Sequence, residues 1–168
     1  MADIISGRDV GDEEIVSLIE LLFFAYRDFT SDPDAILAEW GFGRAHHRVV
    51  HFVGRNPGMT VAQLLSILGI TKQSLGRVLR DLIEKNLVYQ RPGEFDRRQR
   101  LLFLTDEGEA LRLKLMAPQA ERIIRALSEA GDEAEPNYRK VLYHLINPEN
   151  RGSVSDWLNS RTAGTKPE

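Results

Sequence analysis

The sequence contains no cysteine. This absence excludes disulfides, thiolate metal sites, cysteine nucleophiles and redox sensing by thiols. The sequence also lacks any apolar run near the ~20 residues that a membrane-spanning helix needs, and residues 1–8 do not have the basic-then-apolar pattern of a signal peptide. We therefore expect a cytoplasmic protein that does not contact a membrane.

Internal repeats and low-complexity tracts are absent as well. Hydrophobic residues make up 42% and charged residues 28% of the 168 residues, which is ordinary globular composition and argues against wholesale disorder. This length allows one medium domain, or two small lobes that share a core.

Negative charge slightly exceeds positive charge over the whole chain, but one segment has an excess of positive charge. The chain has a net charge of −3, whereas residues 69–100 hold eight cations and four anions, so that segment carries +4 and the remainder −7. Such an asymmetry is expected when one face meets phosphates, although a solvated helix face would explain the charge alone. The order of elements along the chain decides between the two interpretations.

The first part of the chain predicts three helices. Apolar residues at three-and-four spacing indicate an amphipathic helix over residues 13–29. A cap at Ser31 or Asp32, followed by Pro33 at the first helical position, predicts a short second helix. A third helix is predicted over residues 44–55, because an Asn-Pro-Gly sequence follows it and is a strong stop signal.

The centre of the chain has the pattern of a helix-turn-helix unit. Thr60 caps a short helix over residues 61–68, Gly69 makes the turn, and Thr71 caps a second helix over residues 72–86. The second helix buries an apolar stripe and turns a polar, cationic face outward, as a helix that enters a DNA groove requires. The outward face consists of Lys72, Gln73, Ser74, Arg77, Arg80 and Asp81.

A predicted β-hairpin follows the helix-turn-helix unit. Two short apolar runs, residues 87–90 and 100–104, flank a charged stretch, which indicates a hairpin with a long charged tip. Thr105 then caps a long helix that is predicted over residues 106–130.

The helices at both ends of the chain do not belong to the helix-turn-helix unit. A last helix is predicted over residues 137–146, before a polar tail over residues 148–168 that is expected to be mobile. Helices with one apolar face must bury it, and against a second copy they would form a helical dimer core. We expect residues 1–42 and 106–147 to make this dimerisation region, with residues 43–105 as a DNA-binding lobe.

Four short motifs follow one another along this central region. They are Leu-Gly-Ile-Thr-Lys-Gln-Ser at residues 68–74, Leu-Ile-Glu-Lys-Asn-Leu-Val at 82–88, Asp-Arg-Arg-Gln-Arg at 96–100 and Leu-Thr-Asp-Glu-Gly at 104–108. Each is weak alone, but in this order and spacing they resemble the MarR family of bacterial and archaeal transcription regulators. The resemblance implies a mainly α fold with a small β-hairpin wing, in which a winged helix-turn-helix lobe joins a helical dimerisation region formed by the N- and C-terminal helices.

The resemblance also implies which residues contact DNA. The helix from Thr71 would read the major groove, Arg98 would probe the minor groove, and Asp96 would orient a wing arginine and hold the tip in shape. Neighbouring cations would bind phosphates, which position the protein without specifying a sequence. The implied contacts are Thr71, Lys72, Gln73, Ser74, Arg77 and Arg80 on the helix, and Arg97, Arg98 and Arg100 on the wing.

Two residues depart from the family pattern. Gly76 lies inside the second helix, where glycine costs about 1 kcal/mol relative to alanine. We favour a close approach of the backbone to DNA there over a merely tolerated exposed position. Phe95 is apolar at the wing tip, and we expect it to fold back on the base of the wing rather than touch DNA.

A ligand site is implied by the same resemblance, between the dimer helices and the DNA-binding lobe. A small aromatic or anionic effector would suit its aromatic and polar walls, although these residues could simply pack that junction. His47 and His51, four apart on one helix face, could share a metal, but no carboxylate other than Glu39 has a matching spacing, so no metal or cofactor is expected. The candidate walls are Tyr26, Trp40, His46, His47, Arg48 and His51.

The predicted function is therefore a sequence-specific regulator of transcription. We expect it to bind double-stranded DNA as a homodimer on a pseudo-palindromic operator, and to be a repressor that a small ligand relieves. An enzyme is not expected, because the sequence has no Gly-x-Ser-x-Gly elbow, phosphate loop or His-Glu-x-x-His helix. The remaining alternative is a winged helix that binds protein, or an effector sensor that does not read DNA directly. A protein-interaction module would not need a basic wing.

Overall fold

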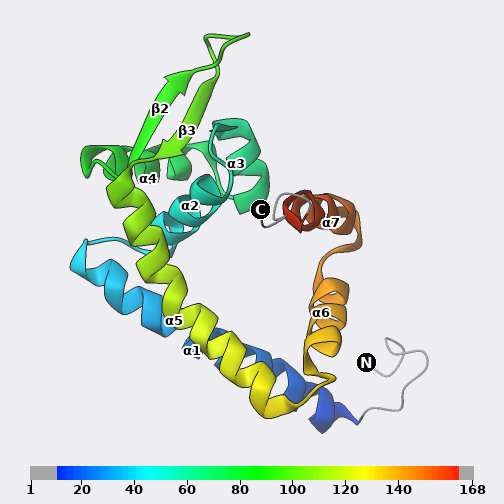
Figure 1. Ribbon diagram of the computed structural model, residues 1–168. Helices are drawn as coiled ribbons and strands as arrows, with labels where there is room; N and C mark the ends of the chain where they lie inside the picture. Colours follow the sequence, from blue (N-terminus) through cyan, green and yellow to red (C-terminus); the bar gives the residue numbers. More distant parts are fainter. Residues whose placement is uncertain (1–10, 163–168) are drawn as a thin grey trace, which may run out of the picture. The chain divides into compact units, whose positions relative to one another are not determined.

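The computed structural model describes residues 11–162, and the side chains of residues 11–159. The chain divides into two compact units, residues 1–122 and 123–168. It is mainly helical with one small antiparallel sheet, as predicted (Figure 1). The elements are α1 (Asp12–Glu39), α2 (Arg44–Arg55), β1 (Met59–Thr60), α3 (Val61–Leu68), α4 (Lys72–Glu84), β2 (Val88–Pro92), β3 (Arg100–Leu104), α5 (Asp106–Ala130), α6 (Ala134–Leu145) and α7 (Pro148–Thr162).

Helix α1 is continuous, so the predicted break before Pro33 is wrong. Ser31 does not cap a new helix, because its hydroxyl donates back to the carbonyl of Asp28 at 2.7 Å. Pro33 has no N–H to donate to the carbonyl of Phe29, four residues earlier. The side-chain amide of Gln119 in α5 donates to that carbonyl instead, at 3.3 Å. A neighbouring helix therefore replaces the hydrogen bond that the proline removes.

The helix-turn-helix unit forms where the sequence predicts it. The hydroxyl of Thr60 accepts from the N–H of Gln63 at the start of α3, and that of Thr71 accepts from the N–H of Ser74 at the start of α4. Gly69 ends α3 with φ +60°, a left-handed conformation that glycine adopts without strain. Helix α4 ends at Glu84, two residues before its predicted end, and the side of α4 that faces the lobe is fully apolar.

The sheet has a third strand that the sequence did not reveal. Its order is β1-β3-β2, and all neighbours are antiparallel. Strand β1 pairs Met59 with Leu102 and is two residues long, too short for any alternation to be visible in the sequence. It closes one edge of the hairpin, whereas the other edge, β2, carries Pro92 at its end. Strands β2 and β3 with the loop between them form the wing.

One continuous core lies beneath α4 and the sheet. It joins buried apolar side chains from α1, α5 and every element between them. Each fully buried leucine contributes roughly 1.5–3 kcal/mol relative to an exposed side chain. The completely buried leucines are Leu37, Leu64, Leu75, Leu82, Leu87, Leu102 and Leu115. Because α4 supplies two of them, burial determines which side of α4 faces solvent.

Thr105 and Gly108 join the start of α5 to the end of the helix-turn-helix unit. The hydroxyl of Thr105 accepts from the N–H of Gly108 at 3.0 Å, as the predicted cap requires, and also donates to the carbonyl of Asn86 at 2.7 Å. A Cβ atom on Gly108 would overlap the carbonyl oxygen of Leu87. Only glycine allows this approach of α5 to the backbone.

The second unit contains the C-terminal helices. The prediction of a mobile polar tail after residue 147 is wrong for the part that the structure describes. Residues 148–162 form α7, with Pro148 at its first position, where a missing N–H costs nothing. Arg151 connects this helix to the preceding one, because its guanidinium donates to the carbonyls of Ile146 at 3.0 Å and His144 at 2.8 Å. Residues 1–10 and 163–168 of the predicted terminal segments lie outside the described residues.

The close approach at Gly108 predicts opposite effects for one substitution at two glycines. Gly108→Ala should lower the free energy of unfolding by about 1–3 kcal/mol, because backbone must shift to admit the methyl group. The matched control is Gly76→Ala in α4, where a Cβ meets nothing within 4 Å, and it should raise stability by about 1 kcal/mol. Chemical denaturation of the full chain measures both; a Gly108→Ala protein as stable as wild type would contradict the packing.

Candidate nucleic-acid interface

Helix α4 presents an apolar side to the lobe and a polar side to solvent. Leu75, Val78, Leu79 and Leu82 are buried, which fixes the rotation of the helix. All six side chains predicted to contact DNA from this helix are consequently exposed. They are Thr71, Lys72, Gln73, Ser74, Arg77 and Arg80.

The wing tip is held by hydrogen bonds around Asp96. Its carboxylate accepts from the backbone N–H of Arg98 at 2.9 Å, and its carbonyl accepts from the N–H of Gln99 at 3.0 Å. The N–H of Gly93 donates across the tip to the carbonyl of Gln99 at 3.1 Å. Asp96 thus contacts the backbone of Arg98, not a guanidinium, and the side chains of Arg97, Arg98 and Arg100 remain exposed.

Phe95 does not fold back on the wing, so that expectation is wrong. Its side chain is fully exposed, at 103%. The aromatic rings near the base of the wing have other partners. Tyr89 stacks on Phe103 with ring centroids 5.4 Å apart, and the guanidinium of Arg91 lies 5.2 Å from each ring. The sequence analysis counted Arg91 only as a charge. The available signal was Tyr89, which lies two positions before Arg91 in β2 and therefore on the same face of the strand.

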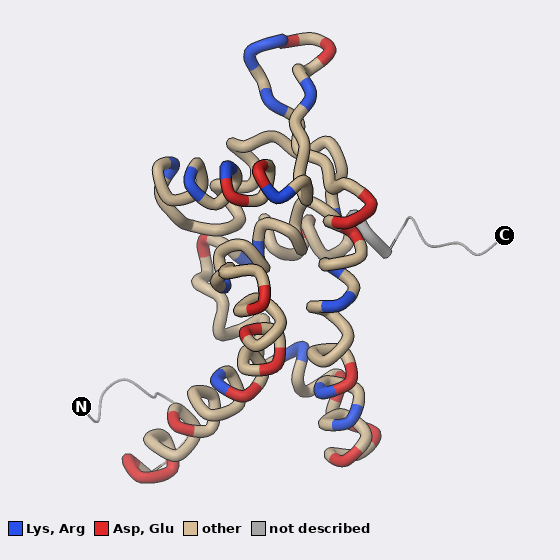
Figure 2. Tube along the Cα trace, turned by 90° about the vertical axis from the view of Figure 1, so that its left-hand side faces the viewer, with Lys and Arg blue, Asp and Glu red and all other residues tan. Residues whose placement is uncertain are grey.

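The cations of α4 and the wing form no ion pair with any residue in the range 11–162. The ion pairs within that range lie elsewhere, and the one that involves α4 uses its acid Asp81, with His46. Figure 2 shows the basic residues along α4 and in the wing, at the top of the view. Unpaired guanidinium and ammonium groups on two consecutive elements can bind a polyanion.

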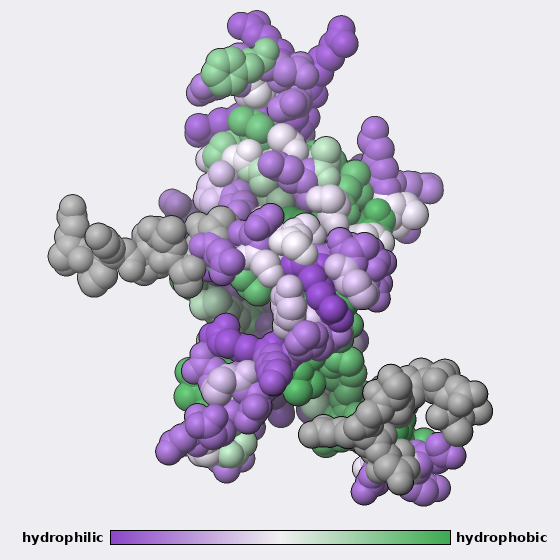
Figure 3. All heavy atoms as spheres, turned by 90° about the vertical axis from the view of Figure 1, so that its right-hand side faces the viewer, coloured by the Kyte–Doolittle hydropathy of each residue, from purple (hydrophilic) through white to green (hydrophobic). Residues whose placement is uncertain are grey.

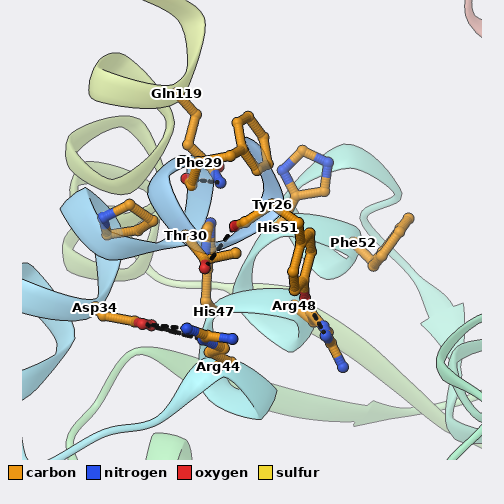
Figure 4. A pocket seen from close by; sticks show the side chains of 11 residues that line it. Tyr26, Phe29, Thr30, Asp34, Arg44, His47, Arg48, His51, Phe52 and Gln119 are labelled. Atoms are coloured by element: carbon orange, nitrogen blue, oxygen red, sulfur yellow. Dashed lines mark hydrogen bonds and ion pairs between the residues drawn. The ribbon is translucent and has the colours of Figure 1, made fainter. Parts of the chain in front are cut away.

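A separate pocket lies between α1, α2 and the side chain of Gln119 (Figure 4). Its volume is about 270 Å³, close to the lower limit for small-molecule sites. Of the predicted walls, Tyr26, His47, Arg48 and His51 line it, whereas Trp40 and His46 do not. The other lining residues are Phe29, Thr30, Pro33, Asp34, Arg44, Phe52 and Gln119.

Trp40 and His46 lie outside the pocket because they belong to an aromatic stack. Phe42 lies between them, with ring centroids 6.1 Å from Trp40 and 4.4 Å from His46. The Nε2 atom of His46 then lies 3.0 Å from the carboxylate of Asp81 in α4. The stack therefore leads from the end of α1 to α4 and away from the pocket.

The two arginines of the pocket differ in their partners. Arg44 donates to both carboxylate oxygens of Asp34, at 2.7–3.1 Å, so its charge is neutralised. Arg48 donates to the hydroxyl of Tyr26 at 3.1 Å, not to a carboxylate. Burial lowers the pKa of His47 below its ordinary value of 6.5, partly opposed by Asp34, so His47 is uncharged at neutral pH. Arg48 is therefore the cation of this pocket that lacks a carboxylate partner among the described residues.

Within residues 11–162, no three His, Asp or Glu side chains lie close enough together to hold a metal ion. Over the same range, none of the helices combines the length and apolar character needed to cross a membrane.

Comparison with known proteins identifies the family. Residues 40–99 match the model of the MarR family. The chain is 49% identical over 137 residues to the HTH-type transcriptional regulator PetP of Rhodobacter capsulatus, covering 82% of each chain. The chain belongs to the MarR family.

Two solved structures have the same fold. FabT of Streptococcus pneumoniae, described in complex with DNA, matches with a TM-score of 0.64 and 20% identity over 78% of this chain and 94% of its own. MarR of Oenococcus oeni matches with a TM-score of 0.61 and 20% identity over 77% and 98%. These findings confirm the predicted family and winged helix fold, and they identify a transcriptional regulator rather than an enzyme.

Proposed function

We propose that this MarR-family protein binds double-stranded DNA at specific sequences, with α4 in the major groove and the wing at the minor groove. The observation that carries this proposal is the set of exposed, unpaired cations on α4 and the wing, on a chain whose net charge is negative. The DNA complex of FabT supports it through the shared fold.

Different side chains have different parts in this binding. Lys72, Gln73 and Arg77 have the donors needed for base edges in the major groove. Arg98 has the planar charge that suits the negative potential of a narrow minor groove, and the brace from Asp96 to its N–H holds its backbone in place. The other cations, Arg80, Arg97 and Arg100 among them, would bind phosphates. Gly76 leaves open space beside α4, which is compatible with a close approach of DNA to the backbone.

The experiment that tests this function selects duplexes from a random-sequence pool with the full chain and then titrates a selected duplex by fluorescence anisotropy. Arg98→Ala should weaken binding by about 1–3 kcal/mol, which is roughly fivefold to 150-fold. Lys114→Ala is the control, because it removes one positive charge at an exposed position of α5 that pairs with Glu39 and lies outside the proposed contacts with DNA. It should leave the affinity within about twofold.

Salt dependence separates this function from the protein-binding alternative. The affinity should fall steeply as salt rises, because each phosphate contact releases counterions. An affinity that does not change with salt concentration would favour a protein-interaction module. An Arg98→Ala protein with unchanged affinity would contradict the role of the wing.

We further propose that the protein is a homodimer that represses at a pseudo-palindromic operator, with residues 1–42 and 106–147 as the dimerisation region and residues 43–105 as the DNA-binding lobe. Helix α1 supports this, because apolar side chains are exposed on all of its sides, as in a helix that a partner surrounds. Apolar surface is also visible in the lower half of Figure 3. The exposed apolar residues of α1 are Val16, Leu18, Ile19, Leu21, Leu22, Phe23, Phe24 and Tyr26.

A charge placed in this face should dissociate the dimer. Ile19, 63% exposed in the single chain, is the test position, and Ile19→Glu should weaken self-association at least tenfold because it buries an unpaired carboxylate. Ser66→Glu is the control, because it adds the same charge at an exposed position of α3. Sedimentation equilibrium measures both; a wild-type protein that is monomeric at micromolar concentration would overturn the dimer.

We also propose that the pocket holds a small aromatic anion that relieves DNA binding. Phe29 and Phe52 provide apolar walls, and Arg48 provides a charge without a carboxylate partner among the described residues. Benzoate is the probe: at millimolar concentration it should raise the melting temperature of the wild type by mass action, with no such rise for Arg48→Gln. The neutral analogue benzamide is the control; equal shifts for both probes or both proteins would contradict an anion site.

A further inference from the structure

His46 and Asp81 form a contact between α2 and α4. His46 is in the first turn of α2, and Asp81 is in the last turns of α4, the proposed DNA-reading helix. Their atoms Nε2 and Oδ2 are 3.0 Å apart. The side chain of His46 is only 13% exposed, whereas that of Asp81 is 40% exposed. The contact therefore ties a half-exposed carboxylate of α4 to an almost buried ring.

The surroundings of His46 determine where its ring proton lies. The backbone N–H of Gly43 donates to Nδ1 of His46 at 3.1 Å, so Nδ1 is an acceptor. In the neutral ring the proton must then be on Nε2, which donates it to Asp81. Stacking on Phe42, with ring planes 6° apart, holds the ring in this orientation. His46 is thus a preorganised donor that points at one carboxylate.

Asp81 has other partners within reach along its own helix. Arg77 lies four residues before it and Lys85 four residues after it, which are the spacings at which opposite charges pair on a helix surface. Neither cation pairs with Asp81 in the described part of the chain, where the carboxylate contacts His46. The acid closest to the proposed DNA-contacting residues of α4 is therefore kept away from them.

We propose that His46 is a positioning residue for DNA binding, which holds the carboxylate of Asp81 and so keeps Arg77 and Lys85 free for DNA. This inference rests on the proposed function. Without the donor on His46, Asp81 pairs with Arg77 or Lys85 and competes with bases and phosphates for them. The released carboxylate also adds repulsion at the phosphate backbone.

The test uses the full chain and a duplex selected by the wild-type protein, with affinity measured by anisotropy. His46→Ala should weaken binding to the duplex about threefold to tenfold. This loss is larger than the strength of one exposed i,i+4 ion pair and smaller than the loss of a complete arginine contact with DNA. Asp81→Ala should bind at least as well as wild type. The double variant His46→Ala/Asp81→Ala should regain the affinity of Asp81→Ala, because no carboxylate remains to compete.

Two companion variants separate this role from a purely structural one. His46→Gln should stay within about twofold of wild type, because glutamine at this helical position accepts from the N–H of residue 43 and still carries a donor for Asp81. Should His46→Ala fail to fold, Gly43→Ser/His46→Ala replaces it, since serine caps α2 without the imidazole and its Cβ meets nothing within 4 Å. That variant should show the same loss and the same recovery on Asp81→Ala.

A His46→Ala protein that folds and binds like wild type overturns the inference, and so does a double variant as weak as His46→Ala. Weakened binding by Asp81→Ala alone also overturns it. If the wild-type chain selects no duplex, the proposed function fails instead, and that result is distinguishable because it precedes any substitution.

Discussion

The burial of one side of α4 is the constraint on which the proposed interface depends. Leu75 and Leu82 are fully buried in the core, together with Leu64, Leu87 and Leu102 from neighbouring elements. A helix with two anchored residues seven positions apart cannot rotate without exposing them, at a cost of roughly 1.5–3 kcal/mol for each side chain. The polar residues of α4 therefore point in a fixed direction, and the proposed contacts with DNA depend on that direction.

The exposed surface of α4 and the wing carries an excess of positive charge. Two acids near the proposed contacts accept from other groups: Asp81 from the imidazole of His46, and Asp96 from the backbone N–H of Arg98. Carboxylates held in this way form no ion pair with the cations of α4 or the wing. A surface of positive charge thus persists on a chain with an overall negative charge.

Helix α2 contributes to two features of the molecule. His47 and Arg48 face the pocket that α1 and Gln119 complete, whereas the neighbouring residue His46 contacts α4. Adjacent residues on one helix point in different directions, 100° apart, so a single rigid element touches both. Correct assignment of these three residues requires the direction of each side chain, which explains why the sequence placed His46 in the wrong group.

Local chemistry determined much of the fold from the sequence alone. The caps at Thr60, Thr71 and Thr105 and the turn at Gly69 depend on hydrogen bonds or dihedral angles within a few residues, so their patterns are visible in the chain itself. The apolar periodicity of α4 likewise selected its exposed face, and the four family motifs indicated the wing.

Three of the features that the sequence missed depend on residues far apart along the chain. Pro33 lies within a continuous helix because Gln119, ninety positions from Phe29, supplies the missing donor. Strand β1 exists only through its pairing with β3, and the partner of His46 lies thirty-five positions away. The sequence determined the helices, their caps and the basic segment, since short-range forces set them. Only the tertiary structure decided which carbonyls and carboxylates find donors, because folding brings those groups together.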